Sequence, residues 1–192
     1  SSTPGYSVSK KLEKTGWWAS DTAELTFEDC RVPVENLIGP ENAGFVAIMT
    51  NFTQERLLLA AQCVAIAELA LREAHRYSKE RQAFGRPIAG FQVIRHKLAD
   101  MSTRLAAARA LTGELAMRHA RGEQDPALAA QTKNAATDML SFVADQAVQI
   151  HGGFGYMREY VVERHYREAR LYPIGGGTRE IMNEIICKAR GY

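Results

Sequence analysis

The sequence predicts a mainly α-helical protein in which a helical bundle follows a short β-strand segment. Beyond about residue 41, apolar residues recur every three or four positions, which places them on one face of a helix. Before that point, the stretch AELTFE at 23–28 alternates apolar and polar residues, which is typical of a half-buried strand. We therefore expect the end of a β domain over residues 1–40 and a helical domain over residues 41–192.

The β segment is expected to contain two short strands, over residues 6–11 and 23–28. Turn and loop signals flank the second strand at residues 21–22 and 31–33. Two short strands do not form a stable sheet on their own. We therefore expect residues 1–40 to be the last part of a truncated β domain whose earlier strands precede this sequence.

Five helices are expected, over residues 41–81, 91–121, 126–150, 159–170 and 178–189. Gly85-Arg86-Pro87 ends the first helical pattern, Gly122 ends the second, and Asp125-Pro126 provides a cap and a first-turn proline for the third. The apolar positions of the first helix include Leu59, Ile66, Leu69 and Tyr77. The second helix carries the most regular stripe, which indicates packing against another helix: Phe91, Ile94, Leu98, Met101, Leu105 and Ala108.

Composition excludes several classes of function. The net charge is only +2 and the basic residues are scattered among acidic ones, so nothing favours nucleic-acid binding. No apolar run approaches the roughly 20 residues of a membrane-spanning helix. The three cysteines are far apart, without a CxxC pair or paired histidines, which indicates a reducing compartment and predicts no metal site.

Two glycine clusters near the C-terminus are the strongest functional candidates. Gly152-Gly153-x-Gly155 and Gly175-Gly176-Gly177 each abut an expected helix end. Glycine lets a ligand approach the main chain, and a helix N-terminus offers unpaired N–H groups to an anion or a carbonyl oxygen. Each cluster taken alone favours a tight turn between helices over a ligand site.

Read together, four motifs resemble the C-terminal two-fifths of the acyl-CoA dehydrogenase family. They occur in the family's order and spacing: SDTAELTFEDCRVPVENLIG, ERQAFGRPIAGFQVIRHKLADM, QIHGGFGYMREYVVERHYREAR and PIGGGTREIMNEII. The resemblance implies a family fold with an N-terminal helical domain, a middle β domain and a C-terminal four-helix bundle. It also implies assembly as a homo-oligomer, a tetramer or a dimer of dimers.

The resemblance implies an activity, a cofactor and partners. Members of the family oxidise an acyl-CoA thioester to the trans-2-enoyl-CoA: a glutamate removes the α-proton, FAD takes the β-hydrogen as hydride, and an electron-transferring flavoprotein accepts the electrons. The expected location is the cytoplasm of a bacterium or the mitochondrial matrix of a eukaryote. The fragment itself is expected to be inactive, because the family's β-domain flavin loop would lie before Ser1.

One departure from the family pattern concerns the base. Most members carry the glutamate just before the Gly-Thr of the last motif, where this sequence has Gly176. In isovaleryl-type and long-chain-type members the base comes from the first helix, and Glu55 stands at the matching position in TQERLL. We therefore expect Glu55 to be the general base, since an apolar acyl tunnel favours proton uptake by a carboxylate. The alternative is an ordinary surface glutamate paired with a neighbour.

The remaining site residues follow from the resemblance alone. On the acyl-CoA side it implies Gln54, Arg56, Gly176 and Gly177, with the Gly176 N–H polarising the thioester carbonyl. On the FAD side it implies Arg81, Phe84, Gln92, Gln149, Ile150, His151, Gly152, Gly153, Thr178, Arg179 and Glu180. Arg81 could instead satisfy the carbonyls at a helix end, Gln92 could be a solvated amide, and His151 could be a packed core histidine.

Two other readings stay open from the sequence. The helical bundle could be a non-catalytic oligomerisation module, for which the stripe on the second helix would suffice. Alternatively, the fold could carry different chemistry, as in acyl-CoA oxidases or flavin monooxygenases that resemble this family. A base for the α-proton, as Glu55 would provide, speaks against the monooxygenases, and the sequence leaves the length and branching of the acyl chain undetermined.

Overall fold

The structure is a computed structural model that describes residues 2–192. The chain divides into two compact units, residues 1–51 and residues 52–192, which are described separately. The first unit contains the two longer strands, and the second contains two very short strands and most of the helical residues. The long helix α1 (Gly44–Glu80) begins in the first unit and continues through the second.

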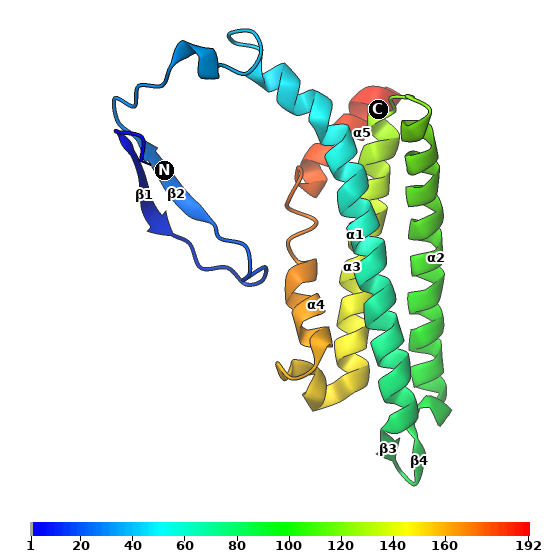
Figure 1. Cartoon of the computed structure of the whole chain (residues 1–192). Helices are drawn as coiled ribbons and strands as arrows, with labels where there is room; N and C mark the ends of the chain where they lie inside the picture. Colours follow the sequence, from blue (N-terminus) through cyan, green and yellow to red (C-terminus); the bar gives the residue numbers. More distant parts are fainter. Residues whose placement is uncertain (1) are drawn as a thin grey trace. The chain divides into compact units, whose positions relative to one another are not determined.

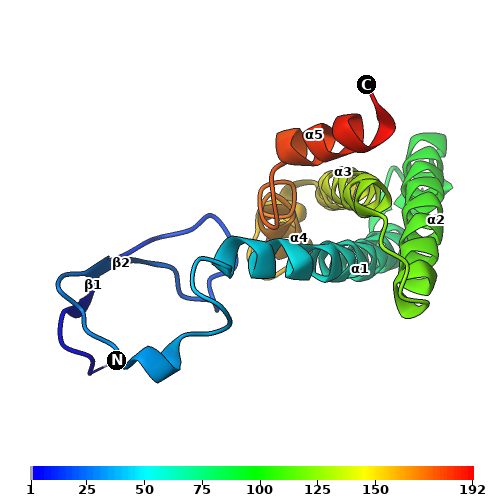
Figure 2. The ribbon, with the colours of Figure 1, turned by 90° about the horizontal axis from the view of Figure 1, so that it is seen from above.

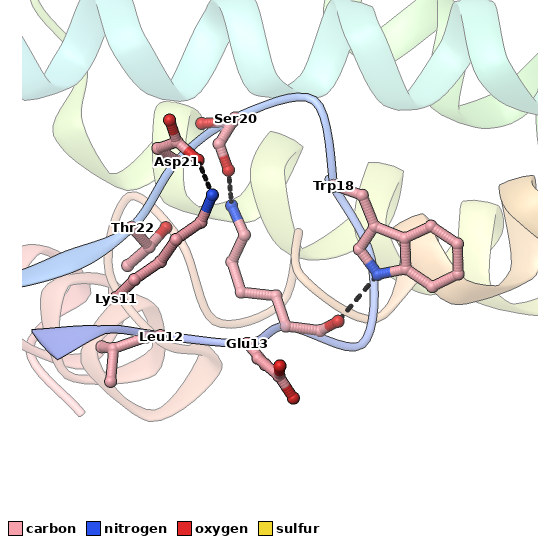
Figure 3. Close-up of a pocket in the computed structure, with 8 residues that line it drawn as sticks. Lys11, Leu12, Glu13, Trp18, Ser20, Asp21 and Thr22 are labelled. Carbon is pink, nitrogen blue, oxygen red and sulfur yellow. Dashed lines mark hydrogen bonds and ion pairs between the residues drawn. The ribbon is translucent and has the colours of Figure 1, made fainter.

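The first unit is built on an antiparallel hairpin of β1 (Tyr6–Lys11) and β2 (Ala23–Phe27). None of the residues of these two strands is buried, which agrees with the expectation that two strands alone do not enclose a core. The loop that joins the strands forms a cavity of about 320 Å³, shown in Figure 3. Its polar groups pair with one another: Lys11 lies 2.9 Å from the Asp21 carboxylate, and the Trp18 indole N–H donates to the Lys14 carbonyl.

The helical unit consists of three long helices and two short ones, whose arrangement can be followed in Figures 1 and 2. After α1, a hairpin of two very short strands, β3 (Gln82–Ala83) and β4 (Arg86–Pro87), leads into α2 (Gln92–Ala120). The helix α3 (Pro126–His151) is followed by a 3₁₀ turn, η3 (Gly152–Tyr156), and by the short helices α4 (Val161–Ala169) and α5 (Arg179–Arg190).

The helix ends follow the local sequence signals. The Asp125 carboxylate accepts a hydrogen bond from the Leu128 amide at 2.8 Å, with Pro126 in the first turn, so α3 starts as predicted. The Thr178 hydroxyl caps α5 in the same way through the Ile181 amide. Gly122 takes a φ of +77°, which lets the chain leave α2. The first helix starts at Gly44 and not at Glu41 as expected, because Pro40–Ala43 form a separate turn.

Helix α3 lies at the centre of the unit and packs against α2, α4 and α5. Its fully buried face is largely made of small residues, which allow the neighbouring helices to approach closely. The predicted stripe on α2 does face inward: its last three members, Met101, Leu105 and Ala108, are buried. No helix in residues 2–192 combines the length and the apolarity needed to cross a membrane.

The buried face of α1 differs from the one that its bulky residues suggested. Leu69 is exposed, and Leu59 and Ile66 are only half-buried. The buried stripe consists mainly of small side chains at steps of three and four: Ala60, Cys63, Ala67, Ala70, Ala74 and Tyr77. Small side chains let α1 lie close to its neighbours, so the short residues and not the long ones fix its inner face.

Candidate functional site

The Gly175-Gly177 turn lies in the segment that connects α4 to α5 (Figure 1), and side chains of α1 and α3 bind its carbonyls. Arg56 of α1 donates from Nε to the Gly176 carbonyl at 3.4 Å, and Lys133 of α3 donates from Nζ to the Gly177 carbonyl at 2.6 Å. Gly176 and Gly177 have φ angles of +63° and +98°, which strongly favour glycine. The sequence therefore uses glycine here to fold the turn onto side chains of α1 and α3.

Glu55 lies directly beside this turn. A Cβ placed on Gly176 would be 3.6 Å from Oε1 of Glu55 and 2.5 Å from Cδ1 of Leu59. Any side chain at position 176 would therefore point into the place that the Glu55 carboxylate and Leu59 already occupy. The structure thus brings together Glu55, Arg56, Gly176 and Gly177, four residues that were predicted separately from two distant segments.

The main chain of the turn presents unpaired donors. Within residues 2–192, the amide N–H groups of Gly176, Gly177 and Thr178 have no acceptor. Because a trans peptide places its N–H opposite its carbonyl, the Gly177 N–H points away from Arg56 and the Thr178 N–H points away from Lys133. These donors can bind a carbonyl oxygen or an anion, and the start of α5 adds the positive end of a helix dipole.

Lys133 is a site residue that the sequence predictions missed. Its side chain is completely buried on α3, and burial lowers the pKa of its ammonium group. Among the described residues, no carboxylate forms an ion pair with it. One sequence signal could have found it: Lys133 belongs to a series of residues spaced three and four positions apart, which places them on one face of the helix. The other members of this buried series are small, apolar or hydroxyl-bearing: Ala130, Thr137, Leu140, Ala144 and Ala147.

The other predicted residues around this turn have varied surroundings. Thr178 caps α5, and Arg179 forms an ion pair with Asp138 of α3. The pKa of the Glu180 carboxyl is lowered, mainly by a hydrogen bond from its own backbone amide and then by one from the Thr178 hydroxyl. Glu180 therefore interacts with the first turn of α5. Gln54 is exposed on α1.

A second group of predicted residues lines an apolar cavity of about 630 Å³ at the other end of α3. Its lining includes five of the residues expected on the FAD side: Arg81, Ile150, His151, Gly152 and Gly153. Four further residues of the lining are large apolar or aromatic side chains that were not among the predicted site residues: Tyr77, Ile88, Phe154 and Met157. A Cβ on Gly152 or Gly153 would meet no atom within 4 Å, so both glycines leave open space.

His151 is a packed residue of this cavity's wall. It is 3% exposed, its ring stacks on Tyr77 with centroids 4.2 Å apart, and its Nδ1 donates to the Ala147 carbonyl at 2.8 Å. A carbonyl only accepts hydrogen bonds, so Nδ1 carries the proton in this arrangement. Burial lowers the pKa of His151, which keeps the ring neutral. Arg81 lies across the cavity, with its guanidinium 5.8 Å from the Phe154 ring centroid.

Phe84 and Gln92 lie outside this cavity. Phe84 is at the tip of the β3–β4 hairpin, where it is 95% exposed and has a φ of +51°. Both features are uncommon for a large aromatic residue, and a bulky side chain in this backbone region is strained. Gln92 starts α2 and lines a shallow, separate cavity of about 460 Å³ with His96, Asp100 and Gln146.

The two groups of residues are far apart within one chain. His151 follows Lys133 by 18 residues of α3, which corresponds to about 27 Å along the helix. Gln149 is exposed near the end of α3 and does not line the apolar cavity. The structure therefore places one group of predicted residues at the glycine turn beside Glu55 and a second group in a distant apolar cavity, with Phe84, Gln92 and Gln149 in neither. Among residues 2–192, no cluster of three or more metal-ligating side chains occurs.

The chain matches known proteins over nearly its whole length. Residues 42–190 match the family model described as "Acyl-CoA dehydrogenase, C-terminal domain". The chain is 42% identical over 184 residues to the long-chain specific acyl-CoA dehydrogenase, mitochondrial, of Rattus norvegicus, covering 96% of this chain and 43% of the relative.

Solved structures agree with that match. A probable acyl-CoA dehydrogenase from Mycobacterium abscessus is 50% identical, with a TM-score of 0.95 over 97% of this chain and 50% of that one. A chain from a structure described as the electron transferring flavoprotein of Acidaminococcus fermentans is 42% identical, with a TM-score of 0.94 over 99% of this chain and 50% of that one.

This chain thus spans at most about half the length of these relatives. Their likeness extends through the helical bundle, the glycine turn and the strand segment that precedes them. The chain belongs to the acyl-CoA dehydrogenase family and contains the C-terminal helical domain of that family.

Proposed function

We propose that the intact protein is an FAD-dependent acyl-CoA dehydrogenase in which Glu55 is the general base. The observation that carries this proposal is the position of Glu55 against Gly176. Position 176 is where most family members would have the catalytic glutamate, and here the Glu55 carboxylate from α1 lies beside that position, next to Leu59. A carboxylate in this place could act on the same substrate atom as a glutamate at position 176 would.

The turn would bind the substrate's thioester carbonyl. The N–H groups of Gly176 and Gly177 are free within the described chain and lie on the residues that contact Glu55 and Arg56. Hydrogen bonds to the carbonyl oxygen would stabilise negative charge there as the α-proton leaves. Glu55 would then take that proton, and the electron pair of the C–H bond would move into the enolate.

FAD would supply the acceptor for the β-hydride, which completes the conversion of the saturated thioester to the trans-2-enoyl thioester. Arg81 is suited to a phosphate group because its guanidinium is exposed beside the apolar cavity. Gly152 and Gly153 leave room for a ligand against the main chain. Because this cavity lies about 27 Å along α3 from the glycine turn, we propose that it receives the cofactor of a neighbouring subunit.

The partners follow from the same proposal. The substrate would be an acyl-CoA, and reduced FAD would pass its electrons to an electron-transferring flavoprotein. A homo-oligomer, a tetramer or a dimer of dimers, would bring the cavity of one subunit to the cofactor of another. The intact protein would work in the mitochondrial matrix or the bacterial cytoplasm according to its source, since the family occurs in both.

The deciding experiment uses the intact flavoprotein without oxygen. A saturated acyl-CoA should bleach the oxidised flavin band of the wild type. Glu55→Gln should retain flavin but bleach at least about 100-fold more slowly, because the amide cannot accept the α-proton. Glu68→Gln is the matched control on the same helix, since Glu68 forms an exposed ion pair with Arg109, and it should bleach at the wild-type rate.

Three results would overturn parts of this proposal. A protein that binds no flavin would be an oligomerisation module. Unchanged bleaching in Glu55→Gln would place the base elsewhere. Rapid reoxidation of the reduced flavin by oxygen would identify an oxidase.

A further inference from the structure

Lys133 is the least expected residue of the helical unit. Its side chain is fully buried in the middle of α3, yet among the described residues its ammonium donates a hydrogen bond to the Gly177 carbonyl alone. An ammonium group has three donors, so two of them have no acceptor within residues 2–192. Burying a cation with so few partners is costly. A neutral apolar residue would pack in this stripe without that cost.

The surroundings of Lys133 connect it to the proposed base. The point where a Cβ of Gly176 would lie is 3.7 Å from Cε of Lys133 and 3.6 Å from Oε1 of Glu55. Lysine and carboxylate therefore approach the same residue of the turn, from α3 and from α1. The charged and titratable groups that face Lys133 are Cys63, Arg56, Arg179 and Glu55.

Two cations hold two successive carbonyls of the turn. Arg56 binds the carbonyl of Gly176 and Lys133 binds that of Gly177. Fixing a carbonyl also fixes the N–H of the same rigid peptide, because the two groups point in opposite directions. The short Lys133 bond therefore orients the peptide between Gly177 and Thr178, and with it the path of the turn beside Glu55.

We propose that Lys133 is a positioning residue for the reaction: it holds the glycine turn so that its free N–H groups face the substrate carbonyl while Glu55 faces the adjacent α-carbon. This inference rests on the proposed dehydrogenase function and adds Lys133 to its site. Lys133 does not exchange a proton with the substrate in this role. Its ammonium also places a positive charge near the enolate that develops in the transition state.

The test compares Lys133→Met and Lys133→Gln with the wild type in the intact flavoprotein. Methionine has a similar length but no charge and no donor, whereas glutamine has a neutral donor. Lys79→Met is the control, since Lys79 is exposed on α1. Anaerobic mixing with a saturated acyl-CoA at several concentrations gives the limiting rate constant of flavin reduction and, separately, the dissociation constant of the acyl-CoA. The infrared C=O stretch of a bound, ¹³C-labelled thioester reports how strongly its carbonyl is polarised.

The expected result is specific to a positioning role. Lys133→Met should retain its flavin and have an unchanged or higher melting temperature, because a buried charge is replaced by an apolar group. Its limiting reduction rate should fall at least about 10-fold with little change in the dissociation constant, and its C=O stretch should move toward the value for the free thioester. Lys133→Gln should lie between, and Lys79→Met should match the wild type.

Two results would overturn the inference. Reduction within about twofold of the wild type in Lys133→Met, with an unchanged C=O stretch, would show that the lysine does not act on the site. Loss of flavin and of the folded state in both variants would show that Lys133 is structural. These results differ from failure of the proposed function, in which the wild type itself would not bleach.

Discussion

The carboxylate of Glu55 lies 3.6 Å from the point that a Cβ of Gly176 would occupy, although the two residues are 121 positions apart in the sequence. Leu59, one helical turn further along α1, lies even closer to that point, at 2.5 Å. The glycine turn and this part of α1 therefore fit together only because position 176 has no side chain.

Gly176→Ala should destabilise the protein by about 2 kcal/mol or more. The φ of +63° is unfavourable for alanine, and the new methyl group would overlap Leu59. Thermal unfolding of the intact protein measures the loss. Gly113→Ala is the matched control: Gly113 lies in α2, with open space around its Cα, so alanine should stabilise the protein by about 0.5–1 kcal/mol. Equal effects of the two changes would contradict the strain at Gly176.

Ala67→Leu tests whether small residues fix the inner face of α1. Ala67 is fully buried, and three extra carbons there should destabilise the protein by about 1–3 kcal/mol through overpacking. Ala65 is exposed two residues away on the same helix. Ala65→Leu should change the free energy of unfolding by no more than about 0.5 kcal/mol. A larger loss for Ala65→Leu than for Ala67→Leu in chemical denaturation would mean that the buried face is assigned wrongly.

Asp125→Ala should cost about 1 kcal/mol of stability by removing the cap of α3. The Asp125 carboxylate accepts from the Leu128 amide and lies 3.5 Å from Arg118. Asp125→Ser separates the two contacts, since serine keeps the cap and loses the charge, and it should be nearly neutral. If urea unfolding shows the same loss for serine as for alanine, the ion pair and not the cap is the stabilising contact.

Acid should destabilise the helical unit through His165. Burial lowers the pKa of His165 from 6.5, and the nearby Arg164 lowers it further. The unfolded chain therefore binds a proton below pH 6.5 that the native chain does not, and stability falls as the pH decreases through that value. His165→Asn should flatten the decline in the free energy of unfolding between about pH 7 and pH 5.5. The exposed His75→Asn should leave the slope unchanged, and an unchanged slope in His165→Asn would contradict the explanation.

Phe84→Asn tests whether Phe84, at the tip of the β3–β4 hairpin, contacts the cofactor at a cost in protein stability. Asparagine tolerates a positive φ better than phenylalanine, so the variant should be equally or more stable. If the 95% exposed ring contacts FAD, as proposed, flavin should dissociate at least about 10-fold more readily. Flavin release on dilution measures this, and unchanged release would remove Phe84 from the cofactor site. Tyr156→Asn, at another exposed aromatic residue, is the control.

The sequence determined the helices because their signals are local. The spacing of apolar residues, Asp125-Pro126 and Gly122 act within a few residues of themselves, and each marked a helix end that the structure has. The family resemblance also identified Glu55 and the glycine turn as parts of one proposed site. That proposal needed the motifs, because nothing in the local pattern distinguishes Glu55 from a surface glutamate.

Only the tertiary structure decided which side chains meet. Local pattern favoured the bulky residues of α1 as its inner face, whereas close helix packing selected Ala60, Ala67 and their small neighbours. The burial of Lys133, and its bond to Gly177 at a separation of 44 residues, depends on where α3 lies against the turn. Local sequence encodes the backbone conformation of each element, but contacts between distant elements are set by how those elements pack, which no single stretch of the chain specifies.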